Sequence, residues 1–398
     1  MQKTLDKQIQ TFKLTEEQDL LRKTIREIAE ENFKEKAREI DKTHRFPREN
    51  FELLSKLGMT GLTLSEKYSG GGMDYVSYAI VIEEIARACV TTSVILAVHL
   101  SLFSKPIEKF GSDYLKDKYL VKLAKGELLG AFCLSEPGNG SDAAAMLTRA
   151  YDKGDHFILN GTKAWITNGS QADVYLVLAQ TDPELKHKGV TAFIVEKNMP
   201  GVSFGKLEDK LGIRASATCQ VRLDNVKVPK ENVLGNIGDG FKIAMVTLDS
   251  GRIGIAAQAL GVAQASFDLA SSYAKTREAF GQKIINFQAI QFMLVEMATE
   301  IEAARLLLYQ AANMHDLGLK FTRQSAEAKL FCSELASKAA NKAVQILGGY
   351  GYTTEYDAER YLRDAKITEI YEGTSEIQRI VIADNIIKEI SNELQSPI

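Results

Sequence analysis

Cysteine and histidine are scarce in this chain, and their scarcity excludes several kinds of chemistry. The four cysteines, Cys89, Cys133, Cys219 and Cys332, lie far apart and form no CxxC pair, and the 5 histidines show neither HxxH nor HExxH spacing. Zinc sites and disulfide frameworks depend on such spacings. We therefore expect free thiols in a reducing compartment and no metal, so that any redox chemistry requires a bound cofactor.

Long apolar runs and an excess of one charge are also missing. No run of about 18 apolar residues is present, which predicts no transmembrane span. Residues 1–11 contain no apolar stretch typical of a signal peptide, so we expect a cytoplasmic protein, or a matrix protein if this is a mature mitochondrial chain. The 49 basic and 52 acidic residues give a net charge of −3, which argues against a broad basic surface for nucleic acid.

Three regions with different residue patterns follow one another along the 398 residues. This length favours two or three subdomains. The first is helical to about residue 129. Thr15 and Gln18 predict a capping box at its start, and the mostly apolar segment 79–102 predicts one long helix buried on nearly all sides.

The second region is predicted to be β-structure, and the third is predicted to be a set of long helices. Between residues 130 and 238, β-branched and aromatic runs bounded by turns predict strands, at 174–179, 190–195 and 221–226. From residue 239 the pattern predicts four helices, at 252–279, 288–317, 322–347 and 375 to about 390, packed as an antiparallel bundle.

Glu372 lies in the stretch with the strongest indication of catalysis. Ser375 and Gln378 are spaced as a capping box, which predicts a helix that begins directly after the acid. Gly373 lets another molecule approach the backbone. A loop carboxylate in a site that becomes dry can act as a base; taken alone, a surface acid is the alternative interpretation.

Two further stretches suit a flat or phosphorylated ligand. Residues 132–142 combine hydroxyls, glycines and Pro137 in a loop whose backbone N–H groups could face a phosphate. Trp165, the only tryptophan, precedes Thr167 by two residues, and in an extended strand both side chains point the same way, as a heteroaromatic ring would require. A structural turn and a core tryptophan are the alternatives.

Taken in order, these stretches resemble the acyl-CoA dehydrogenases, most closely the short-chain (butyryl-CoA) members, from about residue 14 to about residue 390. The resemblance implies an α+β, mostly α fold: an N-terminal helical domain (1–129), a central β-barrel-like domain (130–238) and a C-terminal four-helix bundle (239–398). It also implies a homotetramer, FAD as cofactor, acyl-CoA as substrate and electron-transfer flavoprotein as acceptor, in fatty-acid β-oxidation. Neither nucleic acid nor a membrane is expected as a partner.

The same resemblance assigns roles to individual positions, with Glu372 as the catalytic base. FAD contacts are expected within one subunit at Phe132, Leu134, Ser135, Gly140, Ser141, Trp165, Ile166 and Thr167, the last bonded to flavin N5. Contacts to the FAD of a neighbouring subunit are expected at Arg277, Phe280, Gln288, Gln345, Ile346, Gly348 and Gly349. Thr374 and Glu376 are expected over the pyrophosphate. Substrate contacts are expected at Ser141, Asp249, Arg252, Tyr371 and Gly373.

The implied reaction is the α,β-dehydrogenation of a short acyl-CoA to a trans-2-enoyl-CoA. Glu372 removes the α-proton while a hydride passes from the β-carbon to flavin N5, and the enolate-like oxygen is stabilised by the Glu372 amide and a ribityl hydroxyl. Gly251 stands where the isovaleryl branch carries its base, and Ser93 where the glutaryl branch carries an arginine, so Glu372 is the expected base and a dicarboxylate substrate is disfavoured.

The sequence leaves some questions open. An acyl-CoA oxidase would keep the fold but is generally longer, and a flavin-containing nucleic-acid-binding relative would not need Glu372. A purely structural helical protein would leave the glycine and hydroxyl loops without a purpose. Acyl chain length depends on the pocket floor, which we place among a set of core residues: Ile95, Leu96, Val98, His99 and Leu100.

Overall fold

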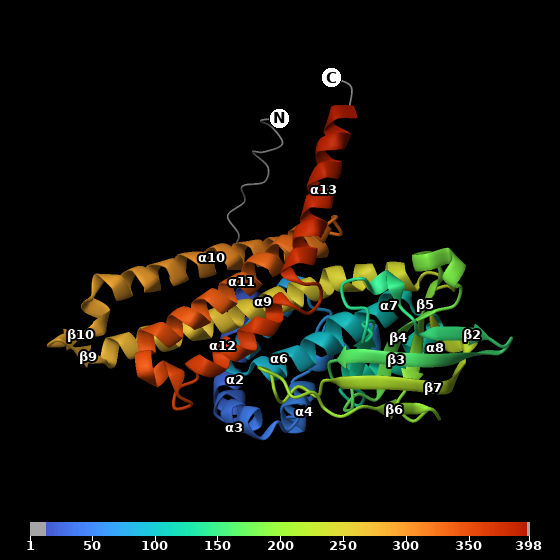
Figure 1. The fold of residues 1–398 in the computed structure, drawn as a ribbon, viewed down its shortest axis with the longest axis horizontal. Helices are drawn as coiled ribbons and strands as arrows, with labels where there is room; N and C mark the ends of the chain where they lie inside the picture. The colour runs from blue at the N-terminus through green and yellow to red at the C-terminus, as the bar shows by residue number, and fades with distance from the viewer. Residues whose placement is uncertain (1–12, 396–398) are drawn as a thin grey trace.

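The computed structural model describes residues 13–395, in which the large β-sheet lies at one end of the molecule and the long C-terminal helices extend from it to the other end (Figure 1). Residues 1–11, on which the expectation of no signal peptide depends, lie outside the described residues. The order of the regions, helical then β then helical, confirms the predicted fold class.

The first region contains seven α-helices between residues 16 and 124: α2 (Glu16–Ala29), α3 (Glu35–Thr43), α4 (Arg48–Lys56), α5 (Tyr75–Ala88), α6 (Val90–Ala97), α7 (Lys105–Phe110) and α8 (Asp113–Ala124). The predicted capping box at the start of α2 is confirmed. The Gln18 amide donates to Thr15 Oγ1 at 3.1 Å, and the Thr15 amide donates to Gln18 Oε1 at 3.1 Å.

The segment 79–102 does not form the single helix that its apolar pattern predicts. Cys89 adopts φ −150° and ψ 102°, which ends α5 and starts α6 in a new direction, and α6 then continues into a π-helical segment, Val98–Ser104. The predicted burial is confirmed, since every residue of the segment except Arg87 is buried. Apolar periodicity cannot reveal such a break, because both helices are surrounded by core on all sides.

The middle region is a mixed β-sheet with the strand order β6-β7-β3-β2-β4-β5-β8, and β1 pairs in parallel with β4. Its strands are β1 (Gly130–Cys133), β2 (Arg149–Asp152), β3 (His156–Ile166), β4 (Val174–Gln180), β5 (Val190–Glu196), β6 (Val202–Phe204), β7 (Cys219–Pro229) and β8 (Val233–Leu234). The three predicted strands lie within β4, β5 and β7. All seven residues of β4 are buried, whereas β7 alternates between buried and open positions, as a half-buried strand should.

The C-terminal region is built on α9 (Gly240–Thr276), which runs from the sheet to the opposite end of the molecule (Figure 1). It begins 12 residues earlier than the predicted helix 252–279. The hairpin of β9 (Glu278–Ala279) and β10 (Gln282–Lys283) follows, then α10 (Gln288–Asp316), α11 (Thr322–Leu347), α12 (Ala358–Lys366) and α13 (Ser375–Gln395).

The four long C-terminal helices are confirmed, but their arrangement within one chain differs from an antiparallel bundle. In Figure 1, α9, α10 and α11 lie side by side, whereas α13 contacts α11 at its base and projects away from the other helices. Among its described residues, α13 exposes several isoleucines, Ile380, Ile386, Ile387 and Ile390. A helix that leaves so much apolar surface uncovered is typical of an interface.

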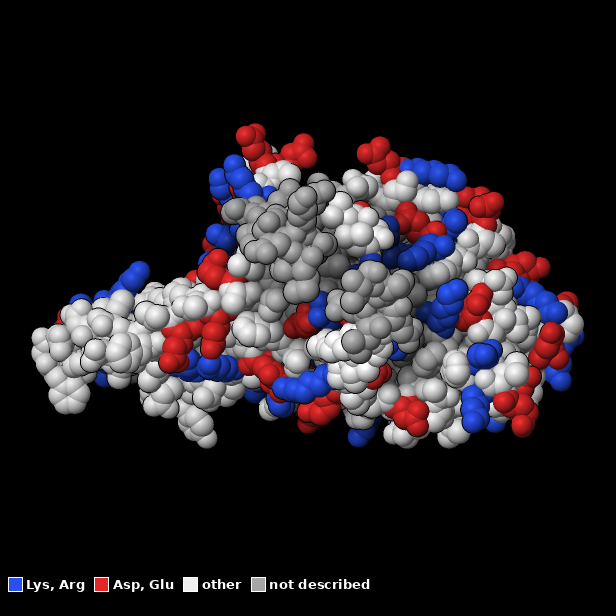
Figure 2. Space-filling view, turned by 90° about the horizontal axis from the view of Figure 1, so that it is seen from above, with Lys and Arg blue, Asp and Glu red and all other residues white. Residues whose placement is uncertain are grey.

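The surface and the cysteines agree with the composition. On the face seen in Figure 2, basic and acidic side chains are interspersed. All four cysteines are free and buried, which confirms the predicted free thiols. Two helical stretches, Val90–Phe110 and Gly240–Thr276, are long and apolar enough to span a membrane, but 94% and 78% of their most apolar windows are buried, as in core helices.

Candidate active site

Glu372 lies in a short loop whose backbone has an unusual conformation. Its φ is 52°, and that of Gly373 is 94°. The left-handed region is easily reached by glycine but unfavourable for glutamate, so the surrounding contacts must hold Glu372 in place. The side-chain amide of Gln378 supplies two of them, donating to the Glu372 carbonyl at 3.1 Å and to the Gly373 carbonyl at 2.9 Å.

These contacts correct the predicted cap of α13. The helix begins at Ser375 as expected, but Thr374 is the residue that caps it, because its hydroxyl accepts the Ile377 amide at 3.3 Å. The predicted capping box of Ser375 and Gln378 is therefore wrong: Gln378 instead reaches back past the helix start to the two carbonyls of the Glu372 loop.

The Glu372 carboxylate is enclosed by two neighbouring elements. A Cβ placed on Gly251 of α9 would lie 2.2 Å from Glu372 Oε2 and 2.7 Å from Leu102 Cδ2. Glycine at this position therefore leaves the space that the carboxylate occupies. Oε2 is buried and has no hydrogen-bond partner among the described residues, so it remains free to accept a proton.

Burial raises the pKa of Glu372 from 4.5 to about 7, while the positive charges of Lys329 and Arg252 oppose the rise. A carboxylate in an apolar site loses hydration, and this disfavours its charged form. The result is a base whose pKa is close to neutral pH, a requirement for efficient proton transfer.

Buried and half-buried polar side chains lie next to the loop. The Tyr371 hydroxyl donates to Gln258 Oε1, and Gln258 Nε2 donates to the Val90 carbonyl at 3.0 Å. The Tyr78 hydroxyl is buried without a partner in the described residues, and a Cβ on Gly254 would lie 2.3 Å from it. Sequence reasoning missed Tyr78, Gln258 and also Leu102, since their helices only indicated core.

Asp249 and Arg252 are brought together on α9, one turn from each other. Arg252 Nη1 donates to Asp249 Oδ1 at 2.6 Å, and the Thr322 hydroxyl donates to Asp249 Oδ2 at 2.7 Å. Arg252 is 5% exposed, and its Nε has no partner among the described residues. A buried guanidinium with an unused donor beside Glu372 is suited to binding a polar part of a ligand.

His99, one of the residues expected at a pocket floor, joins structural elements instead. Its Nε2 lies 3.1 Å from the carbonyls of both Thr60 and Leu123, and the Gly130 amide donates to its Nδ1 at 3.3 Å. Burial lowers the pKa of His99 to about 4, so the ring is neutral. Leu102, outside the expected set, borders the space around Glu372.

The loop 132–142 is fastened by a buried ion pair. Lys163 Nζ lies 2.9 Å from Glu136 Oε1 and donates to the Leu134 carbonyl at 3.0 Å, and Glu136 accepts the amides of Leu147 at 2.6 Å and Thr148 at 2.9 Å. The side chains of the pair are 0% and 4% exposed. Beyond it the loop is open: a Cβ on Gly140 would meet nothing within 4 Å.

Trp165 and Thr167 do not lie together in a regular extended strand. Trp165 has φ 62°, the pairing of β3 with β7 shifts register between Lys163 and Ile166, and β3 ends before Thr167. The assumption of simple alternation was therefore wrong. Trp165 is nevertheless 62% exposed, so its indole is available to a ligand rather than part of the core.

The remaining expected residues lie at the other end of α9. Arg277, Ile346, Gly348 and Gly349 line one cavity of about 530 Å³ together with aromatic Tyr273 and Tyr350. From Arg252 to Arg277 the helix rises about 37 Å at 1.5 Å per residue. The expected residues around Glu372 and those at the far end of α9 are therefore too far apart to surround one spot within a single chain.

Four other expected positions fall near these two groups. Phe280 is 95% exposed in the turn of the hairpin, between β9 and β10. Gln345 and Gln288 are exposed at the end of α11 and the start of α10. Glu376 is exposed in the first turn of α13.

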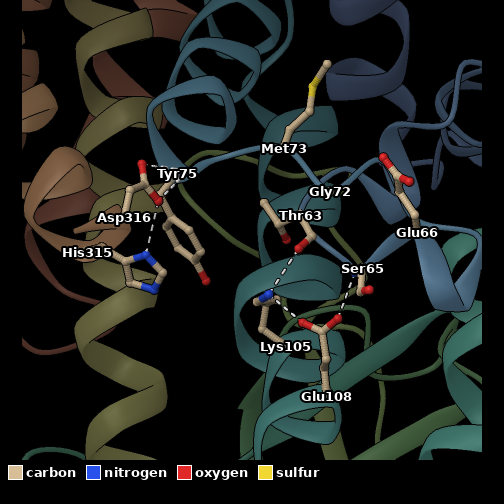
Figure 3. Close-up of a pocket in the computed structure, with 10 residues that line it drawn as sticks. All are labelled: Thr63, Ser65, Glu66, Gly72, Met73, Tyr75, Lys105, Glu108, His315 and Asp316. Carbon is tan, nitrogen blue, oxygen red and sulfur yellow. Dashed lines mark hydrogen bonds and ion pairs between the residues drawn. The ribbon is translucent and has the colours of Figure 1, made fainter. Parts of the chain in front are cut away.

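A second cavity, of about 540 Å³, contains none of the expected residues (Figure 3). Three of its charged groups have partners within the protein: Lys105 pairs with Glu108, and Asp316 accepts the Tyr75 amide at 2.8 Å, at the first turn of α5. Asp316 thus joins the end of α10 to the start of α5, while Lys105 and Glu108 of α7 bind the Thr63 carbonyl and the Ser65 amide.

Sequence models of three acyl-CoA dehydrogenase domains match the chain: the N-terminal domain at residues 15–127, the middle domain at 131–226 and the C-terminal domain at 238–387. The chain therefore belongs to the acyl-CoA dehydrogenase family. It is accordingly an FAD-dependent oxidoreductase, which confirms the expected enzyme class and cofactor.

Individual relatives resemble the chain over nearly its whole length. The mitochondrial short-chain specific acyl-CoA dehydrogenase of Rattus norvegicus is 50% identical over 379 residues, 95% of this chain and 92% of that protein. Butyryl-CoA dehydrogenase from Megasphaera elsdenii superposes with a TM-score of 0.93 at 44% identity, covering 95% and 100% of the two chains. A chain from a structure described as the electron transferring flavoprotein of Acidaminococcus fermentans superposes with a TM-score of 0.93 at 47% identity, covering 95% and 99%.

Proposed function

We propose that this chain converts short acyl-CoA thioesters to trans-2-enoyl-CoA, with Glu372 removing the α-proton. One observation carries the proposal. Glu372 Oε2 is buried without a protein partner among the described residues, and burial brings the pKa of Glu372 to about 7. A carboxylate with a buried, unpaired oxygen and a pKa close to neutral pH is suited to removing a weakly acidic carbon-bound proton.

The loops of the β-sheet fit a flavin. Gly138 and Gly140 leave open space around their backbone, and the Trp165 indole is exposed. Leu134, Ser135, Ser141 and Thr167 are the proposed further contacts, with Phe132 and Ile166 beside them. When bound, FAD supplies an acceptor for the hydride that leaves the β-carbon.

The chain's own residues orient the thioester and control the proton. Arg252, held by Asp249, has a free donor for the coenzyme A part of the substrate. The Glu372 amide is the proposed donor to the thioester oxygen, where negative charge develops. Entry of the acyl chain expels water and so raises the pKa of Glu372 further, while Lys329 and Arg252 limit the rise.

The relatives support a finer assignment. Short-chain specificity is proposed because the similar proteins from Rattus norvegicus and Megasphaera elsdenii carry short-chain and butyryl-CoA activity in their names. Electron-transfer flavoprotein is the proposed acceptor, supported by the similar chain from the Acidaminococcus fermentans structure. A homotetramer is proposed because α13 and the hairpin that follows α9 leave large apolar side chains uncovered.

Anaerobic titration tests the substrate class. Butyryl-, hexanoyl-, octanoyl- and isovaleryl-CoA are added separately to the FAD-loaded protein, and loss of the flavin absorbance is followed. We expect the strongest bleaching with butyryl-CoA, hexanoyl-CoA close behind and little with isovaleryl-CoA. A preference for octanoyl-CoA or longer chains would overturn the short-chain assignment.

The variant Glu372→Gln tests the base. We expect it to keep FAD but to reduce the rate of bleaching by about 10²- to 10⁴-fold, the range typical of a missing general base. The control is Glu334→Gln, an exposed acid on α11 paired with Arg379, which should bleach like the wild type. Rapid bleaching of Glu372→Gln would assign the base elsewhere.

A further inference from the structure

One face of α11 holds the segment that carries Glu372. Lys329, Ser333 and Ser337 follow one another at intervals of four residues and therefore share a face of the helix. Lys329 Nζ donates to the Gly373 carbonyl at 2.8 Å, the Ser333 hydroxyl donates to the Thr368 carbonyl at 2.8 Å, and the Ser337 hydroxyl donates to Glu369. The base is thus carried by a segment attached at three points to one rigid helix.

Lys329 differs from the two serines because it brings a charge into the core. It is 0% exposed, and its ammonium donates to a carbonyl rather than to a carboxylate. A buried ammonium is costly unless opposite charge lies close by. Burial lowers the pKa of Lys329 to about 8, opposed chiefly by the negative charge of Glu372.

Charged groups from each neighbouring element surround this lysine. Arg252 on α9 adds a positive charge, and Glu369 and Glu376 add negative charges from the two sides of the loop. Glu372 has the largest effect of these charges on the pKa of Lys329. Lys329 in turn is the leading charge that lowers the pKa of Glu372, ahead of Arg252. The two residues are therefore coupled electrostatically as well as through the Gly373 carbonyl.

The loop needs such support because its backbone is unfavourable. Glu372 at φ 52° and Gly373 at φ 94° persist only where surrounding contacts determine them. Gln378 holds both carbonyls from the side of α13, and Lys329 holds the Gly373 carbonyl from the side of α11. The Gly373 carbonyl thus accepts two donors from different helices.

We propose that Lys329 is a positioning residue of the active site, whose ammonium fixes the Gly373 carbonyl and places a buried positive charge beside the Glu372 carboxylate. It does not contact the reacting atoms; it acts through Glu372. The inference rests on the proposed role of Glu372 as the base.

The test is Lys329→Met, which keeps an unbranched side chain but removes the charge and the donor. The matched control is Lys338→Met, the same change on the same helix at an exposed lysine paired with Glu300. We expect Lys329→Met to keep FAD while kcat with butyryl-CoA falls about 10- to 100-fold, as when a catalytic group is slightly misplaced. KM should change much less, and the control should match the wild type.

The decisive measurement is the ionisation of Glu372 itself. Infrared spectroscopy of the FAD-loaded protein in the absence of substrate follows the carbonyl band of the protonated acid, identified by its absence in Glu372→Gln. Loss of the lysine charge should raise the midpoint of this band by about one pH unit. A residue that only supports the fold would leave the midpoint unchanged, and that result would overturn the proposal.

Failure of this inference can be told apart from failure of the proposed function. If the wild type is not bleached by any thioester, the proposed function fails, yet the infrared midpoint still decides whether Lys329 acts on Glu372. If Lys329→Met does not fold, Lys329→Gln replaces it, which retains an N–H donor without the charge. A raised midpoint in Lys329→Gln supports the proposal, and an unshifted one contradicts it.

Discussion

Two regions along α9, around Arg252 and around Arg277, differ in how completely a single chain builds them. Near Arg252, the Glu372 loop is enclosed by α9, α11 and α13, its carbonyls are paired, and its carboxylate is buried. Near Arg277, the side chains of Phe280 and Tyr352 are 95% and 87% exposed, and the cavity beside them is lined with glycine and aromatic residues.

The difference teaches that proton transfer and part of cofactor binding can have different structural requirements. The base and its supporting contacts come from one chain, so they should survive changes in assembly. Exposed aromatic side chains around a cavity are typical of a surface that a partner covers. We therefore expect the hairpin end to function only against a second copy of the chain.

Gly251→Ala should have the largest effect, on the enclosed site around Glu372. Alanine usually suits a helix better than glycine, but here its Cβ would lie 2.2 Å from Glu372 Oε2. We expect the rate of bleaching to fall about 10²-fold because the base is displaced. The control is Gly261→Ala on the same helix, where the Cβ would meet the Glu83 carbonyl at 2.4 Å. Both variants should lose stability, but if both bleach normally, Glu372 can move without consequence.

Arg277→Ala should weaken FAD binding at the exposed cavity near the C-terminal end of α9 and leave the site around Glu372 intact. The Arg277 guanidinium lies 5.9 Å from the centre of the Tyr350 ring and borders the cavity. Loss of a charged hydrogen-bond donor should weaken FAD retention about tenfold, seen as a falling ratio of FAD to protein on dilution. Bleaching per bound FAD should stay normal. Arg222→Ala, at an exposed arginine of β7, is the control; full FAD at low protein concentration in Arg277→Ala would assign no role to this end.

The smallest expected effect is on stability. The pKa of Glu372 is about 7 in the folded chain against an ordinary value of 4.5, so between these pH values the folded state binds more protons than the unfolded state. Its contribution to stability is complete below pH 4.5 and is lost as pH rises through 7. Glutamine has no such loss, so at pH 8 Glu372→Gln should unfold with a free energy about 1–2 kcal/mol higher than the wild type.

Denaturant titration at pH 5 and pH 8 measures this difference. The advantage of the variant should be clearly smaller at pH 5, where the wild-type acid is protonated in the folded chain. Equal stability of the two proteins at pH 8 would mean that the carboxylate is better solvated than its burial indicates.

Much of the fold was predictable because its signals are local. The strands β4 and β5 and the start and end of α11 follow from β-branched runs, turns and helical periodicity. The break at Cys89 and the early start of α9 could not be predicted in this way. Segments that are buried on all sides have no polar face, so their apolar pattern carries no information on where a helix bends or begins.

The site was predictable only where it lies in a continuous motif. Glu372, its glycine and Arg252 stand in short stretches that resemble a known family. Leu102, Tyr78 and Lys329 reach the same site from distant helices, and no local pattern marks them except a lysine within an alanine-rich helix. The roles of the expected cofactor residues and the domain boundaries 1–129, 130–238 and 239–398 stay predictions.

The pair of Lys163 and Glu136 has a consequence for how this sequence can vary. Both side chains are almost fully enclosed, so loss of either partner would leave an isolated charge in the core, at a cost of about 3–5 kcal/mol. Joint replacement by two apolar residues of similar volume avoids that charge. Amino-acid substitutions at these two positions should therefore occur together. A chain with only one of the two residues replaced would need a compensating charged group elsewhere in the same loop.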